Sequence, residues 1–213
     1  MNGYFSLVLH AHLPYVRHPE YEEFLEEDWL YEAITETYIP LLEMFENLTR
    51  DNIPWNITIT MSGTLVNMLN DGLLRERYLR HMNKLVEFCE NEVERLSPYP
   101  DMLNVAKHNL WFNTRARQVF EEKYNKDLVG AFRKFQDQGN LEIIPVTATH
   151  GFLPVMKDYP EAVNAQVLMA KKDYIKNFGR DPKGIWLAEC AYYPGQDKFL
   201  EKHGIRYFLV DAH

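Results

Sequence analysis

Glu189 stands at the end of a short apolar run, Gly-Ile-Trp-Leu-Ala-Glu, at residues 184–189. A run of this length and composition predicts a buried strand. A carboxylate at the carboxyl end of such a strand can attack the anomeric carbon of a sugar as a nucleophile, or act as a general base. Strand alternation predicts that Glu189 shares one side with Leu187 and Ile185, while Trp186 faces the covering helices. The alternative for Glu189 is a structural salt bridge.

Three histidines follow two other predicted strands. His10 and His12 are two residues apart at the end of the run 4–10, and His150 follows the run 141–147. Neutral imidazoles at such an edge can hydrogen-bond sugar hydroxyls, or they can begin a metal site. Zinc needs three or four ligands in tetrahedral arrangement. The three histidines, with Asp211 or Glu189 nearby, could supply them, but no His-x-x-x-His or Glu-x-x-His spacing supports a metal, so we predict neither a metal nor a cofactor.

Two further residues are candidates for contacts with a ligand. Asp211 ends the predicted strand that follows the one bearing Glu189, and neighbouring strands lie about 4.8 Å apart. The two carboxylates could therefore approach the ~5 Å separation of a retaining glycosidase pair, although a hydrogen-bonding or purely structural role for Asp211 is equally open. Trp29 opens a helix after an acidic stretch, residues 20–28, and its flat ring could support the face of a sugar.

The remaining charged clusters have structural interpretations. We expect the acidic stretch 20–28 to be a solvated surface, and the basic residues Arg75, Arg77, Arg80 and Lys84 to line an exposed helix face. Cys190 has no evident base partner, so we expect it to serve packing.

The elements that must position these residues alternate between strand and helix patterns. Apolar residues spaced three or four apart predict a first helix over 30–48, kinked at Pro40, and further helices. These are predicted over 78–96, 120–135, 162–178, with Gly179 as C-cap, and 197–202. The predicted strands cover residues 4–10, 55–61, 141–147, 184–188 and 206–210.

Crossovers of this length predict a parallel sheet. A barrel and an open doubly wound sheet both fit the pattern. The barrel is favoured because no glycine-rich phosphate loop follows a strand and because polar residues gather at the carboxyl ends of the strands, where barrels place active sites. Five strands do not close a typical barrel, so we expect the 213 residues to be the first part of a longer protein.

Composition narrows the classes of function. The chain is 46% apolar and 25% charged, which is ordinary for a globular protein. Its net charge of −8 disfavours a nucleic-acid partner. With two cysteines far apart, no leader and no run of ~18 apolar residues, we expect a protein without a membrane span in the reducing cytoplasm.

Three segments resemble the ordered motifs of glycoside hydrolase family 57. They are His-Ala-His-Leu-Pro-Tyr (10–15), Thr-His-Gly-Phe-Leu-Pro (149–154) and Trp-Leu-Ala-Glu-Cys-Ala-Tyr (186–192), and the resemblance continues to Val-Asp-Ala-His at 210–213. It implies the amino-terminal portion of a distorted (β/α)7 barrel, with parallel strands, long crossover helices and retaining chemistry on α-1,4-glucans.

The same resemblance implies roles for individual residues. Glu189 matches the catalytic nucleophile, and His10, His12 and His150 match residues lining the sugar-binding cleft, with Trp29 near it. The family's general acid is an aspartate further along the chain, beyond residue 213. Asp211 is therefore expected at the rim of the site without a catalytic role.

The resemblance is strongest to 1,4-α-glucan branching enzymes, which transfer a glucosyl intermediate to a sugar 6-hydroxyl. An α-amylase or 4-α-glucanotransferase on the same scaffold is the first alternative. A metal-dependent polysaccharide deacetylase and a non-catalytic glucan-binding fragment are the others. We expect residues 1–213 to form a single, incomplete catalytic domain that continues in the parent protein, and this segment alone to be inactive or barely active.

Overall fold

The structure is a computed structural model that describes residues 3–211; Ala212 and His213 of the last motif lie outside the described residues. The chain divides into two compact units. The sheet unit comprises the described residues of Met1–Tyr15, Pro54–Met68 and Phe132–His213, and the helical unit comprises Val16–Ile53 and Leu69–Ala131. The prediction of a single domain over 1–213 stays a prediction.

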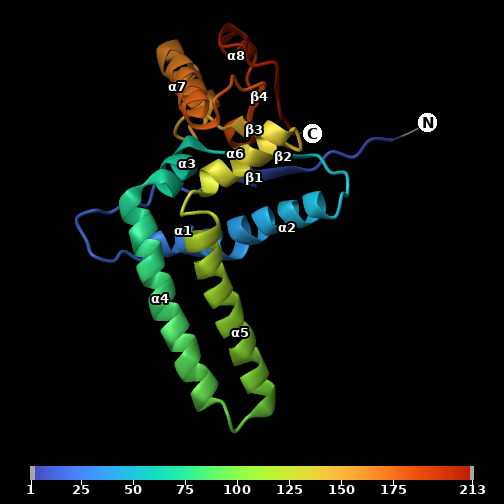
Figure 1. The fold of residues 1–213 in the computed structure, drawn as a ribbon. Helices are drawn as coiled ribbons and strands as arrows, with labels where there is room; N and C mark the ends of the chain where they lie inside the picture. Colours follow the sequence, from blue (N-terminus) through green and yellow to red (C-terminus); the bar gives the residue numbers. More distant parts are fainter. Residues whose placement is uncertain (1–2, 212–213) are drawn as a thin grey trace. The chain divides into compact units, whose positions relative to one another are not determined.

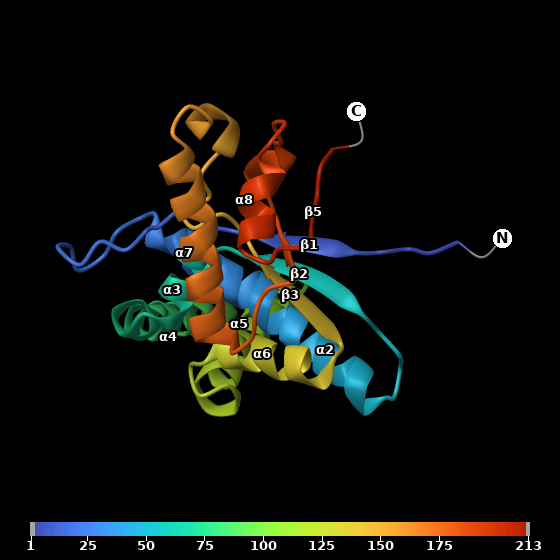
Figure 2. The same cartoon turned by 90° about the horizontal axis from the view of Figure 1, so that it is seen from above.

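All five predicted strands are present in the sheet unit, and every pair is parallel (Figures 1 and 2). One sheet has the order β1-β2-β3 and a second pairs β4 with β5. A bridge between Val146 and Trp186 joins them, and the Trp186 N–H donates to the Pro145 carbonyl at 2.9 Å. The strands are β1 (Val8–Ala11), β2 (Ile57–Met61), β3 (Leu141–Pro145), β4 (Gly184–Ile185) and β5 (Tyr207–Phe208).

The spatial order of the strands therefore follows their order along the chain. A doubly wound sheet instead reverses direction at a switch point, so the sequential order is of the kind found in barrels. The predicted α/β fold with parallel pairing is confirmed, and the described residues form a three-stranded and a two-stranded sheet joined by the isolated bridge between Val146 and Trp186.

The strands are shorter than predicted, most clearly at the amino terminus. Residues 4–7 lie outside β1, and Tyr4 and Phe5 are almost fully exposed. Pairing starts where Val8 faces Thr58, because β2 itself begins only at Ile57. The apolar composition of residues 4–7 suggested a strand, but a strand needs a partner with which to share backbone hydrogen bonds.

The helices of the sheet unit cover β4 and β5. The α7 helix ends as predicted at Gly179, whose φ of +72° is left-handed and whose N–H donates to the Ile175 carbonyl. Two further helices, α3 and α6, contain residues of both units. The bounds are α3 (Gly63–Asn70), α6 (Leu128–Gln138), η3 (Leu153–Met156), α7 (Pro160–Phe178), η4 (Ala188–Cys190) and α8 (Asp197–Lys202).

The predicted facing of the fourth strand was wrong. Ile185 and Leu187 are fully buried in a core with Val163 and Val167 of α7 and with Leu200 of α8. These aliphatic side chains face the helices, so Trp186 points to the opposite side of the sheet. Glu189 does not continue the alternation, because it lies in the turn η4 and not in a strand.

The helical unit contains the predicted helix over 30–48, built in three segments. A π-helical turn, η1, separates α1 from α2 and ends two residues before Pro40. Proline has no backbone N–H, and the change in helix type at this point accommodates the missing hydrogen bond. The predicted helix 78–96 is part of α4, which forms a hairpin with α5 (Figure 1). The bounds are α1 (Glu27–Glu32), η1 (Ala33–Tyr38), α2 (Ile39–Arg50), α4 (Gly72–Arg95), α5 (Pro100–Gln118) and η2 (Val119–Lys123).

The prediction of one helix over 120–135 was wrong. The chain leaves η2 through Asn125 and Lys126, which have φ values of +48° and +63°. Asp127 directly precedes α6, and its carboxylate accepts the Gly130 N–H at 2.9 Å. Helical spacing of apolar residues continued across this break and concealed it.

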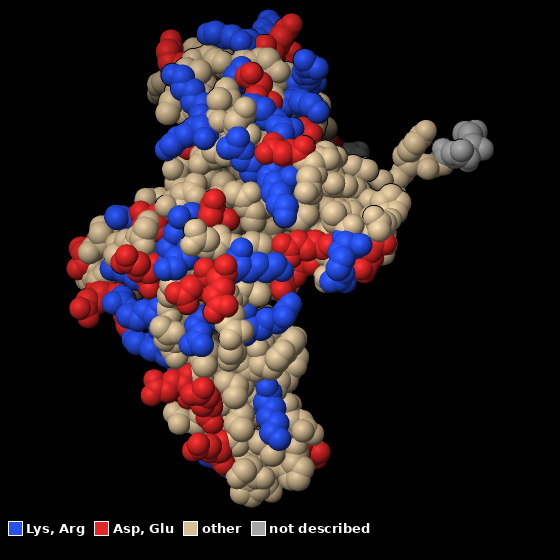
Figure 3. Space-filling view, in the orientation of Figure 1, with Lys and Arg blue, Asp and Glu red and all other residues tan. Residues whose placement is uncertain are grey.

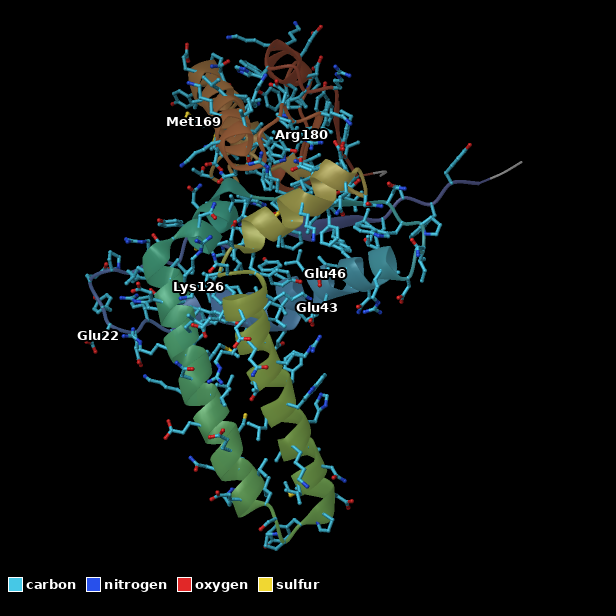
Figure 4. All side chains as sticks on the ribbon, viewed as in Figure 1. Glu22, Glu43, Glu46, Lys126, Met169 and Arg180 are labelled. Atoms are coloured by element: carbon cyan, nitrogen blue, oxygen red, sulfur yellow. The ribbon has the colours of Figure 1, made fainter. Side chains whose placement is uncertain are left out.

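Ion pairs join the segments of the helical unit at its surface. Glu43 of α2 accepts hydrogen bonds from Arg115 of α5, and Glu46 pairs with Lys123 of η2. Figure 4 labels the two glutamates on α2. On the face shown in Figure 3, acidic and basic side chains are interspersed. Along the described residues, no helix has both the length and the apolarity needed to cross a bilayer.

Candidate active site

His10 and His12 lie at the carboxyl end of β1. His10 is the penultimate residue of the strand, and His12 follows directly after it. Being two residues apart, they project to the same side, and their ring centroids are 6.3 Å apart.

Hydroxyl groups of the neighbouring strand hold both rings. His10 Nδ1 lies 2.6 Å from Thr60 Oγ1, and His12 Nδ1 lies 2.9 Å from Ser62 Oγ. Both hydroxyl residues are fully buried. The parallel register sets this match, because His10 is paired with Thr60 and each step of two residues brings the next pair to the same face. The sequence analysis missed Thr60 and Ser62, although the Thr-x-Ser spacing on the adjacent strand mirrors His-x-His.

His150 completes a cluster of three histidines. Its ring stacks on that of His12 with centroids 3.8 Å apart, and it lies 5.7 Å from His10. Its backbone is left-handed, with φ at +56°. Its Nε2 is buried and has no hydrogen-bond partner among the described residues. The predicted convergence of the three histidines is therefore present in the structure.

Trp186, the residue directly after β4, lies against the histidine cluster. Its ring stacks on His10 at a centroid distance of 4.6 Å and an interplanar angle of 25°. The sequence analysis predicted that Trp186 faces the helices, and this prediction was wrong. The two aliphatic neighbours, Ile185 and Leu187, could have corrected this, because aliphatic side chains suit the helix-covered side and a ring with a polar N–H suits a site.

Glu189 presents a carboxylate beside these rings. It occupies the turn η4 with a left-handed φ of +54°, as does Cys190 after it. Its side chain is 74% exposed, and its Oε1 lies 4.0 Å from His150 Nδ1. Left-handed backbone is costly for residues other than glycine and is concentrated at functional sites. The turn holds the Glu189 carboxylate at the edge of the cluster and leaves it open to a ligand.

Burial favours the neutral forms of His10 and His12. It lowers the pKa of His10, with a further lowering from His150 and an opposing effect of Glu189. It lowers the pKa of His12 to about 4, and His150 and His10 contribute in the same direction. Near pH 7 these two imidazoles are therefore uncharged hydrogen-bonding groups, each able both to donate and to accept.

Asp211 lies at the edge of the same unit and is exposed. Together with burial, its charge and that of Glu189 raise the pKa of the Cys190 thiol. The role of Asp211 stays a prediction.

The comparisons with known proteins decide the family. The family model for glycosyl hydrolase family 57 matches residues 6–213. The chain belongs to glycosyl hydrolase family 57. Among solved structures, the α-amylase AmyC from Thermotoga maritima matches with a TM-score of 0.95 and 45% identity, over 100% of this chain and 40% of that one. The GH57-type branching enzyme from Pyrococcus horikoshii matches with a TM-score of 0.91 and 34% identity, over 98% and 42%.

A curated relative points the same way. The 1,4-alpha-glucan branching enzyme of Thermococcus kodakarensis is 38% identical over 100% of this chain and 33% of its own length. A crystal structure of a family 57 branching enzyme from that organism, in complex with glucose, matches with a TM-score of 0.87. The chain thus spans between a third and about two fifths of the lengths of these relatives.

The resemblance found in the motifs is confirmed. The chain belongs to family 57, and its α/β fold matches the amino-terminal part of these structures. The role of each site residue stays a prediction. Trp29, which lies on α1 of the helical unit with 48% of its surface exposed, is one of these.

Metal coordination does not suit the histidine cluster as it is arranged. Within residues 3–211, no group of three or more His, Cys, Asp or Glu side chains is placed to hold a metal ion. The rings of His12 and His150 are stacked almost parallel, at an interplanar angle of 14°. Parallel stacked rings direct their nitrogens side by side, whereas a tetrahedral site needs ligands that converge on one point.

Proposed function

We propose that this chain carries the nucleophile and part of the sugar-binding cleft of a retaining α-glucan-active enzyme of family 57, and that the complete protein is a 1,4-α-glucan branching enzyme. The observation that supports this most is Glu189, an exposed carboxylate on a left-handed turn beside the histidine cluster.

The proposed reaction proceeds in two displacements. A carboxylate oxygen of Glu189 forms a bond to the anomeric carbon while the glycosidic C–O bond breaks, and the leaving oxygen takes a proton from a general acid. A sugar 6-hydroxyl then attacks the same carbon, which releases Glu189 and returns the proton to the acid's conjugate base. In the proposal that acid is an aspartate beyond residue 213, so residues 1–213 alone are inactive.

The geometry suits the first displacement. The 74% exposed side chain of Glu189 is accessible to a ligand. The neutral rings of His10 and His12 offer hydrogen bonds to sugar hydroxyls and bring no positive charge that would bind the carboxylate. The stacked surface of Trp186 on His10 gives the cluster a flat aromatic side.

The barrel is part of the same proposal. Five strands in sequential parallel order leave β1 and β5 as the outer strands. We propose that further strands of the complete protein pair with them and close a distorted (β/α)7 barrel around the histidine cluster. We place the enzyme in the cytoplasm, where Cys89 and Cys190 remain free thiols.

An α-amylase is the second candidate, because the AmyC structure shares 45% identity with this chain. The two candidates differ in the acceptor that reaches the glycosyl intermediate, which is water in the amylase and a sugar hydroxyl in the branching enzyme.

The test is a product analysis with the complete protein. The enzyme is incubated with amylose, and new α-1,6 linkages are counted against new reducing ends, with Glu189→Gln as the control. Branches with few reducing ends would support the branching enzyme, and reducing ends without branches would replace it with the amylase. The Glu189→Gln variant should lose roughly 10³-fold or more of the activity. Full activity in that variant would refute the retaining mechanism, and activity lost to a chelator would favour a metal-dependent deacetylase.

A further inference from the structure

A chain of hydroxyl groups leads from His12 into the backbone of the sheet unit. His12 Nδ1 lies 2.9 Å from Ser62 Oγ, and Ser62 Oγ lies 3.0 Å from Thr64 Oγ1. The chain ends at a carbonyl, because Thr64 Oγ1 donates to the Leu13 oxygen at 2.9 Å. Every link belongs to residues of one compact unit.

The carbonyl at the end fixes the direction of each hydrogen bond. A carbonyl oxygen only accepts, so the single hydroxyl proton of Thr64 lies on the bond to Leu13. Thr64 Oγ1 can then only accept from Ser62, which uses the single proton of Ser62. The Ser62 oxygen also accepts the N–H of Leu65 at 3.3 Å.

Because Ser62 donates its hydroxyl proton to Thr64, Ser62 Oγ must accept a hydrogen bond from His12. Nδ1 of His12 therefore carries the hydrogen. A second contact agrees with this direction, since Thr64 Oγ1 lies 3.5 Å from the same Nδ1 and has no proton left to donate to it. The lowered pKa of His12, about 4, means that the ring holds only this one proton near neutral pH.

We propose that His12 is locked in the Nδ1–H tautomer and that its bare Nε2 is an acceptor-only site for a hydroxyl group of the substrate, with Ser62 and Thr64 as positioning residues. This inference rests on the proposed function for the identity of the ligand, a sugar hydroxyl. The assignment of the tautomer rests on the hydrogen-bond chain alone.

His10 has no such constraint. The hydroxyl of its partner Thr60 can donate to Nδ1 or accept from it, so either nitrogen of His10 can present a proton to a ligand. The two histidines are two residues apart and face the same side, but the structure separates their chemistry: toward a ligand His12 can only accept a hydrogen bond, while His10 can donate or accept.

The first test measures the tautomer directly, without a substrate. The full 213-residue chain is labelled with ¹⁵N-histidine, and long-range ¹H–¹⁵N correlations at pH 7.5 identify the protonated ring nitrogen, with His12→Gln used to assign the signals. We expect the Nδ1–H form for His12. The Nε2–H form in the unmodified chain would overturn the proposal.

Variants of Thr64 then test the cause. Thr64→Val keeps the shape but removes the acceptor of the Ser62 proton, which becomes free to donate to Nδ1, so His12 should change to the Nε2–H form. Thr64→Ser restores the chain and should keep the Nδ1–H form, and the His10 signals should be the same in both. A His12 tautomer unaffected by Thr64→Val in a folded chain would refute the mechanism. If Thr64→Val does not fold, Ser62→Ala serves instead, and persistence of a pure Nδ1–H form in that variant counts against the chain.

The third test concerns the ligand and uses the complete enzyme. Thr64→Val should raise KM for an α-glucan by roughly 2- to 10-fold with a smaller change in kcat, because an acceptor for a substrate hydroxyl becomes a donor, and Thr64→Ser should restore KM. An unchanged KM alongside a changed tautomer would refute the ligand role of Nε2. Failure of the proposed function would leave the tautomer result standing, so the two can be told apart.

Discussion

Each of the two units buries a cluster of polar side chains, and the two clusters are built differently. In the helical unit, Glu27 and Arg77 form a buried ion pair, with exposed fractions of 1% and 6%. Glu27 also accepts from the Tyr31 hydroxyl at 2.8 Å, and Arg77 donates to the carbonyls of His18 and Tyr21. The charges compensate each other, and the hydrogen bonds tie the loop before α1 to α4.

Each cluster has a buried nitrogen without a hydrogen-bond partner among the described residues, Arg77 Nε in the helical unit and His150 Nε2 in the sheet unit. In the sheet unit, however, the Glu189 carboxylate beside His150 is 74% exposed. Both residues have a left-handed backbone. Buried polar groups are normally satisfied, and strain persists where the surrounding structure imposes it. A polar cluster whose buried charges compensate each other thus indicates a stabilising role, whereas a strained cluster with an exposed carboxylate indicates a binding site.

The same substitution in each cluster gives the clearest contrast. Glu27→Gln removes the counter-charge of a buried arginine and should destabilise the fold by about 3–5 kcal/mol. Glu189→Gln alters an exposed side chain and should change stability by less than about 0.5 kcal/mol. Urea unfolding of both variants at pH 7.5 measures the difference. Equal losses of stability would show that Glu189 is a structural residue and that the two clusters do not differ in kind.

The neutral histidines predict a dependence of stability on pH. The folded state lowers the pKa of His10 and His12 below the ordinary value of about 6.5. Below pH 6.5 these two histidines bind protons in the unfolded chain but resist protonation in the folded chain. The stability that the neutral histidines contribute is therefore complete above pH 6.5 and is lost as pH falls toward 4.

With allowance for its partial exposure, we expect His12 to account for about 1–2 kcal/mol of this loss. The free energy of unfolding, measured from pH 7 to 4, should therefore fall less steeply in His12→Gln than in the parent. The matched control is His108→Gln, since His108 is an exposed residue of α5. Parallel curves for His12→Gln and the parent would show that burial of His12 does not oppose its protonation.

The smallest expected effect concerns strain in the helical unit. Lys126 has a φ of +63° in the turn between η2 and α6, where glycine fits without cost. Lys126→Gly should therefore stabilise the protein by about 0.5–1 kcal/mol. Thermal unfolding measures this, with Lys107→Gly in the helical interior of α5 as a control that should destabilise. A loss of stability in Lys126→Gly would indicate that the lysine side chain contributes more than its backbone strain costs.

Sequence patterns predicted the features that arise locally. The five strands, the α7 helix with its Gly179 cap and the meeting of His10, His12 and His150 all follow from periodicity and from the rule that parallel strands end on one edge. These features depend on residues near one another in sequence or on a regular topology.

The features that the sequence analysis missed arise from partners distant in the chain. Arg77 was expected on an exposed face and Glu27 on a solvated loop, and both expectations were wrong because each residue buries the other's charge across fifty positions. Trp186 faces the histidine cluster because Ile185 and Leu187 pack against α7 and α8 on the opposite side. The break at Asn125 and Lys126 was hidden because apolar spacing carries no information about two left-handed residues.

The sequential pairing of the strands also constrains how the chain folds. Thr58 of β2 pairs with Val8 on one side and with Glu142 on the other, so long stretches of chain, including all of 69–131, separate strands that share hydrogen bonds. Closing such long loops costs entropy before any pairing repays it, and folds dominated by distant contacts form slowly. We therefore expect the local hairpin of α4 and α5 to form early on the folding pathway, while the edge that carries the histidines is completed late.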